Sequence, residues 1–242
     1  MPSGWRGALV VGAVLAVAST HAAGQETGGS KSPPLPPPRP PADRAEVFGP
    51  PIPNPEPKDA SAANPDGDTC PSRLAKLGAR FEPRPALQEG SCGGGDIVML
   101  TGLPGGVAVA PGATMTCPVA EALSRWTVDA LTKEAERHLQ QSPTKVLIGT
   151  SYECRNQRSG AKLSEHAFAN AVDIMGFEFA KRGPLTVAFQ PENSPEAAFQ
   201  DAVRKGACSH FTTVLGPGSD AAHADHLHLD LRGRNGAYRI CQ

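Results

Sequence analysis

The stretch that decides the fold lies near the end of the chain and reads Ala222-His223-Ala224-Asp225-His226-Leu227-His228-Leu229-Asp230-Leu231. From Asp225 onward, polar and apolar residues alternate. Alternate residues of a β-strand share one face, so the three leucines are expected to face the core. His226, His228 and Asp230 then share the opposite face. We therefore predict a strand over residues 227–231, with His228 and the preceding His226 on its polar side.

Two interpretations of this polar face are open. It can be the solvated side of an edge strand, since any short alternating run is compatible with that. A metal site is the sharper interpretation, because exposed strand faces usually carry Thr, Lys or Glu. Imidazole is also the commonest protein ligand for zinc, and His223 lies just upstream.

Composition limits what the chain can be. Its 242 residues include 25 prolines and 26 glycines, and 39% are hydrophobic, which suits one domain of moderate size that is shorter than the chain. The formal net charge is -1, from 23 basic and 24 acidic residues. This balance gives no reason to expect a nucleic-acid partner, and we expect a monomer.

The N-terminal region is typical of an exported protein. Residues 1–23 combine Arg6, an apolar run over residues 8–18 and small residues up to Ala23, as in a secretory signal peptide cleaved near Ala22 or Ala23. The run is too short to span a bilayer, so we expect a periplasmic or secreted protein without a transmembrane segment. An uncleaved anchor is the alternative.

A proline-rich linker follows at residues 24–67. Residues 33–41 read Pro-Pro-Leu-Pro-Pro-Pro-Arg-Pro-Pro, and the segment has too few aliphatic side chains to fold. Prolines favour an extended polyproline II spacer. The folded domain is therefore expected at residues 68–242.

Six cysteines remain: Cys70, Cys92, Cys117, Cys154, Cys208 and Cys241. An even number in an exported chain predicts up to three disulfides, with fifteen possible pairings. Cys70 and Cys92 are the pair we favour, because they are close in sequence, and the other two bonds stay open. A thiolate metal site is the rival interpretation, which the wide, irregular spacing weakens.

The pattern of the domain predicts an α+β fold with a small, largely antiparallel sheet flanked by helices, stapled by disulfides. One helix is expected from Cys117 to about Gln140, with proline at its first turn, and another from Ser194 to Gly206. Short strands are expected at residues 97–100, 107–110, 145–152, 227–231 and 238–241.

A second cluster combines with the C-terminal histidines. It reads Ser164-Glu165-His166-Ala167-Phe168-Ala169-Asn170-Ala171-Val172-Asp173. A loop residue, His166, and a strand residue, Asp173, can converge on one ion. Together with His228 they supply the two nitrogens and one oxygen that a catalytic zinc uses, leaving a fourth position for water.

These motifs resemble a known family. The segment Ser151-Tyr152-Glu153-Cys154-Arg155, the Ser164-x-His166-x6-Asp173 cluster and the closing His-x-Asp-His-Leu-His-Leu-Asp are similar to the bacterial extensin-like C-terminal domain family. The arrangement also resembles the lysostaphin, D-Ala-D-Ala peptidase and hedgehog-type zinc fold. The resemblance implies that His166, Asp173 and His228 bind Zn²⁺. Related sequences often have glycine at the position of Ala169.

The same resemblance implies roles for further residues. The order of His223, His226 and His228 is similar to that of penicillin-insensitive murein endopeptidases, in which the first two histidines act near the bound water. His226 is the candidate base or oxyanion stabiliser with His223 assisting, and Asp225 is the alternative base. Arg155 is expected either to pair with a substrate carboxylate or to form a structural ion pair. Asp230 is either a hydrogen-bond acceptor for a ligand imidazole or solvated.

The resulting prediction is a zinc hydrolase that cleaves peptide amide bonds in the stem peptides of peptidoglycan, as an endopeptidase or a carboxypeptidase. A cell-wall-binding module that keeps zinc for structure is the alternative from another class. A disulfide-stapled structural domain without metal is the third, and the convergent ligand residues argue against it. The first two cannot be separated by fold, because fold does not imply activity.

Overall fold

The computed structural model describes residues 68–158 and 160–242. The expected signal peptide at residues 1–23 and the linker at residues 24–67 lie outside the described residues. In the part of the chain that the structure describes, no helix is long and apolar enough to cross a membrane.

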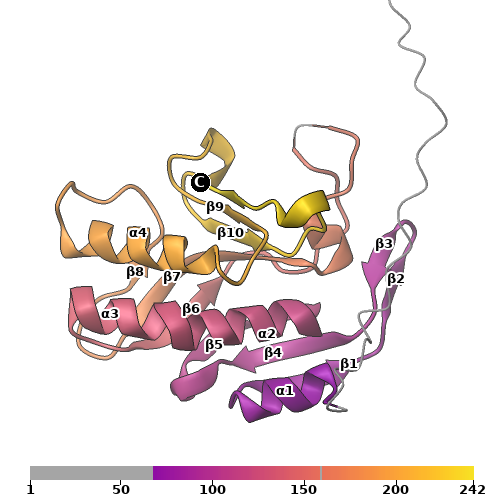
Figure 1. The fold of residues 1–242 in the computed structure, drawn as a ribbon, viewed down its shortest axis with the longest axis horizontal. Helices are drawn as coiled ribbons and strands as arrows, with labels where there is room; N and C mark the ends of the chain where they lie inside the picture. Colours follow the sequence, from indigo (N-terminus) through magenta and orange to yellow (C-terminus); the bar gives the residue numbers. More distant parts are fainter. Residues whose placement is uncertain (1–67, 159) are drawn as a thin grey trace, which may run out of the picture. The chain divides into compact units, whose positions relative to one another are not determined.

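The described residues form one α+β domain around a mixed sheet of nine strands (Figure 1). The strand order is β1-β4-β5-β6-β7-β10-β9-β11, and β8 also pairs with β7. Neighbours are antiparallel except β5 with β6 and β9 with β11, so the predicted antiparallel character is confirmed. The strands are β1 (Arg80–Arg84), β4 (Ile97–Gly102), β5 (Ala108–Thr116), β6 (Pro143–Ile148), β7 (Ala171–Phe179), β8 (Leu185–Thr186), β9 (Thr213–Leu215), β10 (Leu227–Asp230) and β11 (Ile240–Cys241). A separate hairpin is formed by β2 (Leu87–Glu89) and β3 (Cys92–Gly94).

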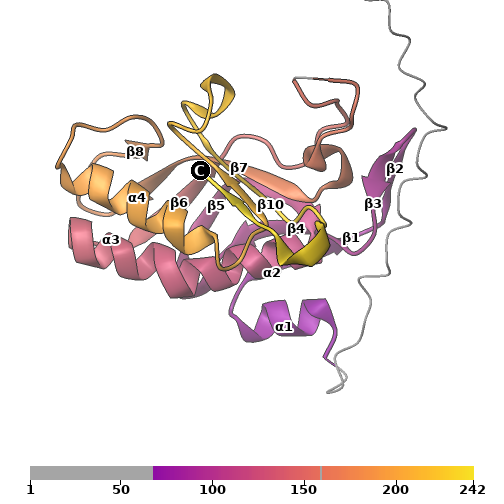
Figure 2. The ribbon, with the colours of Figure 1, turned by 45° about the horizontal axis from the view of Figure 1, so that its top comes forward.

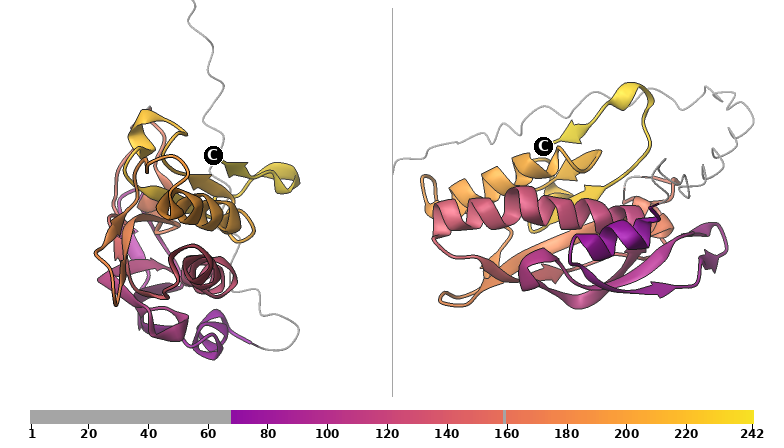
Figure 3. Two further views of the ribbon diagram at one scale, coloured as in Figure 1. Left: turned by 90° about the vertical axis from the view of Figure 1, so that its left-hand side faces the viewer. Right: turned by 60° about the horizontal axis from the view of Figure 1, so that its bottom comes forward.

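The helices cover one face of this sheet (Figure 3, left). In Figure 2, α4 lies alongside α3, and α1 lies beside α2. The helices are α1 (Cys70–Lys76), α2 (Cys117–Trp126), the π-helical turn η2 (Thr127–Leu131), α3 (Thr132–Leu139) and α4 (Pro195–Ala207). Short 3-10 turns occur at η1 (Pro104–Gly106), η3 (Glu165–Phe168), η4 (Ala221–His223) and η5 (Asn235–Ala237).

The hydrophobic core lies between the helices and the sheet. Trp126, Phe177 and Phe199 are fully buried there, and the rings of Phe177 and Phe199 meet edge to face with centroids 5.3 Å apart. The buried indole N–H of Trp126 donates to the carbonyl oxygen of Val203 at 2.9 Å. This bond ties α2 to α4, because a buried indole needs an acceptor.

Most predicted elements are confirmed. The helix expected over residues 117–140 is present as the continuous run α2, η2 and α3. At the start of α4 the Ser194 hydroxyl accepts from the Ala197 N–H at 3.1 Å, as an N-cap does. The strand expected over residues 145–152 ends at Ile148, and beyond it Gly149 and Thr150 still bond the backbone of Asp173 in β7.

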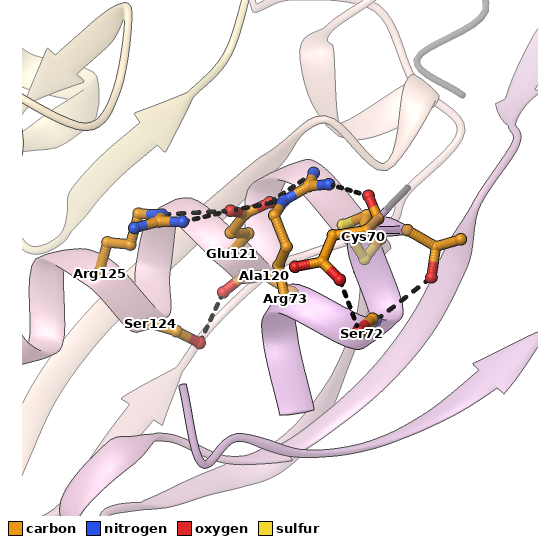
Figure 4. Close-up of a disulfide and its surroundings, with 10 residues drawn as sticks. Cys70, Ser72, Arg73, Ala120, Glu121, Ser124 and Arg125 are labelled. Carbon is orange, nitrogen blue, oxygen red and sulfur yellow. Dashed lines mark hydrogen bonds and ion pairs between the residues drawn. A yellow bond between two sulfur atoms is a disulfide. The ribbon is translucent and has the colours of Figure 1, made fainter. Parts of the chain in front are cut away.

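The expected Cys70–Cys92 disulfide is wrong. All six cysteines are paired, as Cys70–Cys117, Cys92–Cys154 and Cys208–Cys241. Sequence proximity failed because α1 packs against α2, which begins at Cys117, whereas the β2–β3 hairpin extends towards the loop that carries Cys154. Figure 4 shows the first link together with the guanidinium of Arg73, which pairs with Glu121 of α2 at 2.9 Å.

Candidate metal centre

Three predicted ligands meet on the face of the sheet opposite the helices. His166 comes from η3, Asp173 from β7 and His228 from β10. The Nε2 atom of His166 lies 3.2 Å from the Oδ1 atom of Asp173 and 3.2 Å from the Nδ1 atom of His228. The same Nδ1 atom is 2.9 Å from Asp173 Oδ1. Two nitrogens and one oxygen thus form a compact triangle.

Strand pairing explains why Asp173 and His228 are so close. They are directly opposite each other in the antiparallel β7–β10 pair. The backbone N–H of Asp173 donates to Thr150 O at 2.8 Å, and its carbonyl accepts from Gly149 N at 2.9 Å, so both groups point towards β6. On the β10 side Asp173 and His228 are therefore a non-hydrogen-bonded pair, the kind that brings side chains closest.

Hydrogen bonds on the outer nitrogens fix both histidine tautomers. The Nδ1 atom of His166 lies 2.9 Å from the carbonyl oxygen of Ser151, which can only accept, so Nδ1 carries the proton. The Nε2 atom of His228 lies 3.1 Å from the carboxylate of Asp230. When both rings are neutral, as metal binding requires, the remaining nitrogens, His166 Nε2 and His228 Nδ1, thus turn lone pairs towards the Asp173 carboxylate.

Asp230 is itself held in place. Its carboxylate accepts from the Thr213 hydroxyl of β9 and from the backbone N–H of Arg232, the latter at 3.0 Å. The Asp230 side chain is almost completely buried. Asp230 therefore accepts a hydrogen bond from the His228 imidazole, and the solvated alternative for Asp230 is wrong.

This donor set fits a zinc ion. Two ligands about 2.0 Å from a tetrahedral metal lie about 3.3 Å apart, close to the three separations of this triangle. Lone pairs facing one another need a cation between them, because electron-rich atoms repel. Two imidazole nitrogens and a carboxylate oxygen are also a set found in catalytic zinc sites.

The pKa values of the triangle reflect the same electrostatics. Burial raises the pKa of Asp173, but the adjacent imidazoles of His166 and His228 outweigh burial and hold it well below its usual range. Burial lowers the pKa of His228, but the hydrogen bonds to Asp173 and Asp230 raise it to about 9. In the metal-free protein a proton on His228 thus provides the cation, and a metal ion that binds there displaces it.

The turn η3 places His166 through backbone geometry. The residue that caps its C-terminal end, Ala169, has φ 52°, in the left-handed region that glycine adopts most easily. The neighbouring strand β3 passes close by at Gly94, where a Cβ atom would lie 2.8 Å from the carbonyl oxygen of Phe168.

His226 and His223 lie beside the triangle. The Nδ1 atom of His226 is 2.9 Å from Asp225, and its Nε2 atom is 3.8 Å from Asp173 Oδ1. The Nδ1 atom of His223 is 2.8 Å from Asp220. Burial lowers the pKa of His223, although Asp220 opposes that shift. Asp225 thus orients the imidazole of His226, and Asp220 orients that of His223.

A cleft of about 1170 Å³ surrounds these residues. Arg155 lines it, with Nε 2.7 Å from Glu153 and Nη1 3.4 Å from the carbonyl oxygen of Asn156. Arg155 therefore forms the structural ion pair and also borders the cleft, so both expectations for it remain compatible with its position.

Sequence reasoning missed several residues of the site. The Ser151 carbonyl is a backbone group, which no side-chain pattern reveals. Thr213 carries no motif of its own, and Glu165 and Arg232 were given no role although they line the cleft. The Glu165 side chain is largely buried, which raises its pKa, and it accepts from the Asn170 amide at 2.7 Å.

The fold and the site together define an α+β domain with three disulfides and a candidate metal centre on the open face of its sheet. The model of the Extensin-like protein C-terminus family matches residues 68–242, so the chain belongs to this family. No curated protein matches the chain. No solved structure matches it either.

Proposed function

We propose that the protein is an exported zinc-dependent hydrolase that cleaves peptide amide bonds in peptidoglycan. The observation that carries the proposal is the triangle of His166, Asp173 and His228, in which hydrogen bonds to Ser151 and Asp230 aim the lone pairs inward. The resemblance to the lysostaphin, D-Ala-D-Ala peptidase and hedgehog-type zinc fold supports the same chemistry.

The open side of the triangle favours catalysis over a closed structural site. A zinc ion held by these ligands would polarise a peptide carbonyl and activate a water molecule for attack. His226 lies on this side, 3.8 Å from Asp173 through Nε2, and its Nδ1–H is held by Asp225. His226 then accepts the proton of the attacking water at Nε2 and returns it to the leaving amine as the C–N bond breaks.

His223 assists from the same wall of the cleft. Its ring centroid is 5.2 Å from that of His226 and 5.7 Å from that of His228. Because Asp220 holds Nδ1, the Nε2 atom turns a lone pair towards the cleft, where it can accept a hydrogen bond from the attacking water beside His226. Export through the expected signal peptide would bring this site to peptidoglycan, and the proline-rich linker would give the domain reach.

The test is digestion of purified sacculi, with the released muropeptides identified by mass. Wild-type protein loaded with zinc should release peptides, and a chelator should stop the release. His226→Ala should reduce the rate by about a hundred- to ten-thousandfold at equal zinc content, since it removes the proposed base. His138→Ala is the matched control, because His138 pairs with Glu134 on α3, away from the cleft.

Two results would reject the hydrolase. Release that is unchanged in His226→Ala would remove the proposed base from the mechanism. Wild-type protein that binds sacculi and zinc but releases nothing from several cross-link types would favour the zinc-containing wall-binding module.

A further inference from the structure

Arg232 lines the cleft, and within residues 68–158 and 160–242 its guanidinium forms an ion pair through its Nε atom only. It follows β10 and has a side chain that is 40% exposed. Its Nε atom lies 3.8 Å from Oε1 of Glu165. Among the described residues, no acceptor binds its two terminal nitrogens. The fork of Arg232 is therefore available to a ligand.

The carboxylate of Glu165 is itself held in place beside the Nε atom of Arg232. Its Oε2 atom accepts from the Asn170 amide at 2.7 Å, and its side chain is only 14% exposed. The backbone of Arg232 is fixed as well, because its N–H donates to Asp230 at 3.0 Å and its carbonyl accepts from the Thr212 hydroxyl at 2.8 Å. The Arg232 side chain thus extends from a backbone held by hydrogen bonds and is oriented by the largely buried carboxylate of Glu165.

The other arginines at the cleft differ in this respect, because each donates through at least one terminal nitrogen, and they are Arg155, Arg158 and Arg234. Arg234 donates through one terminal nitrogen to Thr212 O at 3.0 Å and through the other to the Thr213 hydroxyl at 2.7 Å. Its fork is used to join β9 to the C-terminal segment. Arg155 is held by a short 2.7 Å contact to Glu153 and by its neighbour's carbonyl. Arg232 keeps more of its hydrogen-bonding capacity than either.

We propose that Arg232 binds a free carboxylate of the substrate, with Glu165 and Asn170 as positioning residues. The inference rests on the proposed function, since it names what the hydrolase recognises. A guanidinium fork matches a carboxylate with two parallel hydrogen bonds. Arg232 lies four residues beyond His228, within about 13 Å of it along an extended chain, so the carboxylate belongs to a peptide residue near the cleaved bond.

The experiment uses two stem peptides that differ only in one group, a free carboxylate or its carboxamide. Hydrolysis of both is measured with wild-type protein, Arg232→Ala and Arg232→Lys. Arg232→Ala should lower kcat/KM for the carboxylate peptide by roughly 10- to 100-fold, the usual effect of losing hydrogen bonds to a charged group. The carboxamide peptide should change less than twofold, and Arg232→Lys should fall between the two.

The control is Arg137→Ala, which removes an exposed arginine paired with Glu134 on α3. It should leave both substrates unaffected. An equal loss on both peptides in Arg232→Ala would mean that Arg232 only supports the fold, and no loss on either would show that the carboxylate binds elsewhere. Both results overturn the inference.

Equilibrium binding of the same two peptides to the zinc-loaded protein separates this inference from the proposed function. Tighter binding of the carboxylate peptide that disappears in Arg232→Ala, without hydrolysis by wild type, would keep the subsite and reject the hydrolase. Hydrolysis of both peptides at equal efficiency would keep the hydrolase and reject the subsite. Failure to bind or cleave either peptide would reject both.

Discussion

The two faces of strands β7 and β10 use one alternating pattern for different purposes. Towards the helices, Val172, Ile174, Leu227 and Leu229 are buried in the core. Towards the cleft, Asp173 and His228 converge with His166, and Asp230 stands behind them. The side chains of the apolar face are stabilised by packing alone. The lone pairs of the polar face converge and need a cation between them.

The apolar face thus holds the candidate ligands in register and contributes nothing to their chemistry. A one-residue slip between the strands would exchange the two faces, so core packing also secures the His228–Asp173 pairing. Substitutions on the two faces should therefore have separable effects on stability and on metal affinity.

The largest effect is expected from the disulfides. Cys92–Cys154 closes 62 residues and Cys70–Cys117 closes 47, and each should contribute about 4 kcal/mol to the free energy of unfolding. Only Cys92–Cys154 ties down the loop that carries the Ser151 carbonyl, which orients His166. Replacing both of its cysteines by alanine should therefore weaken zinc binding as well.

The matched control is the double alanine variant of Cys70 and Cys117, which lies between α1 and α2 (Figure 4). Denaturant unfolding gives stability, and competition with a chromophoric chelator gives zinc affinity. We expect zinc affinity to drop only in the variant that lacks Cys92 and Cys154. Equal affinities in the two variants would break the link between that disulfide and the metal centre.

Leu229→Ala tests the apolar face. Leu229 is fully buried, so the substitution should lower the free energy of unfolding by about 2–5 kcal/mol. Zinc stoichiometry under native conditions should stay at the wild-type value, since the leucine points away from the ligands. Loss of zinc from this variant while it remains folded would show that the two faces are not separable.

The pH dependence of the metal-free protein tests the polar face. The pKa of His228 is about 9 in the folded state, above its ordinary value of 6.5. Its stabilising contribution is therefore complete below pH 6.5 and is lost as the pH rises through 9. The loss should reach about 3 kcal/mol.

Denaturant unfolding in the presence of a chelator measures this dependence. His228→Gln removes the titrating group and should flatten the curve between pH 6.5 and 9.5. A wild-type protein that becomes more stable over this range would contradict the environment described for His228.

Asp230→Asn tests the support behind the ligand and should have the smallest effect. The amide keeps a similar size but is a weaker acceptor for the Nε2 proton of His228. Zinc affinity should fall by about 10- to 100-fold, the usual cost of changing such a partner. Asp225→Asn is a useful comparison, because Asp225 contacts His226 and none of the three ligands. An unchanged zinc affinity in Asp230→Asn would show that the hydrogen bond between His228 and Asp230 does not support metal binding.

Much of this arrangement could be predicted from the sequence. The alternation after Asp225 identified the two faces of β10, because a strand leaves only two directions for its side chains. The helical spacing after Cys117 identified α2 to α3. His166, Asp173 and His228 were grouped by motif resemblance, and the structure places them together.

Other features depend on tertiary packing. Disulfide partners are chosen by which elements come together, so Cys70 lies next to Cys117 rather than Cys92. Strands β1 and β3 contain Pro83, Gly93 and Gly94, which resemble loop residues in sequence. Thr213 reaches Asp230 only because β9 pairs with β10.

The central claim is that His166, Asp173 and His228 form one zinc site. The most direct measurement is the zinc content of purified wild-type protein, His228→Ala, Asp173→Ala and the core variant Leu229→Ala, determined by native mass spectrometry after equilibration with zinc. We expect one zinc ion per chain in wild type and Leu229→Ala, and loss of that ion in His228→Ala and Asp173→Ala. A full equivalent of zinc retained by both His228→Ala and Asp173→Ala would contradict this claim.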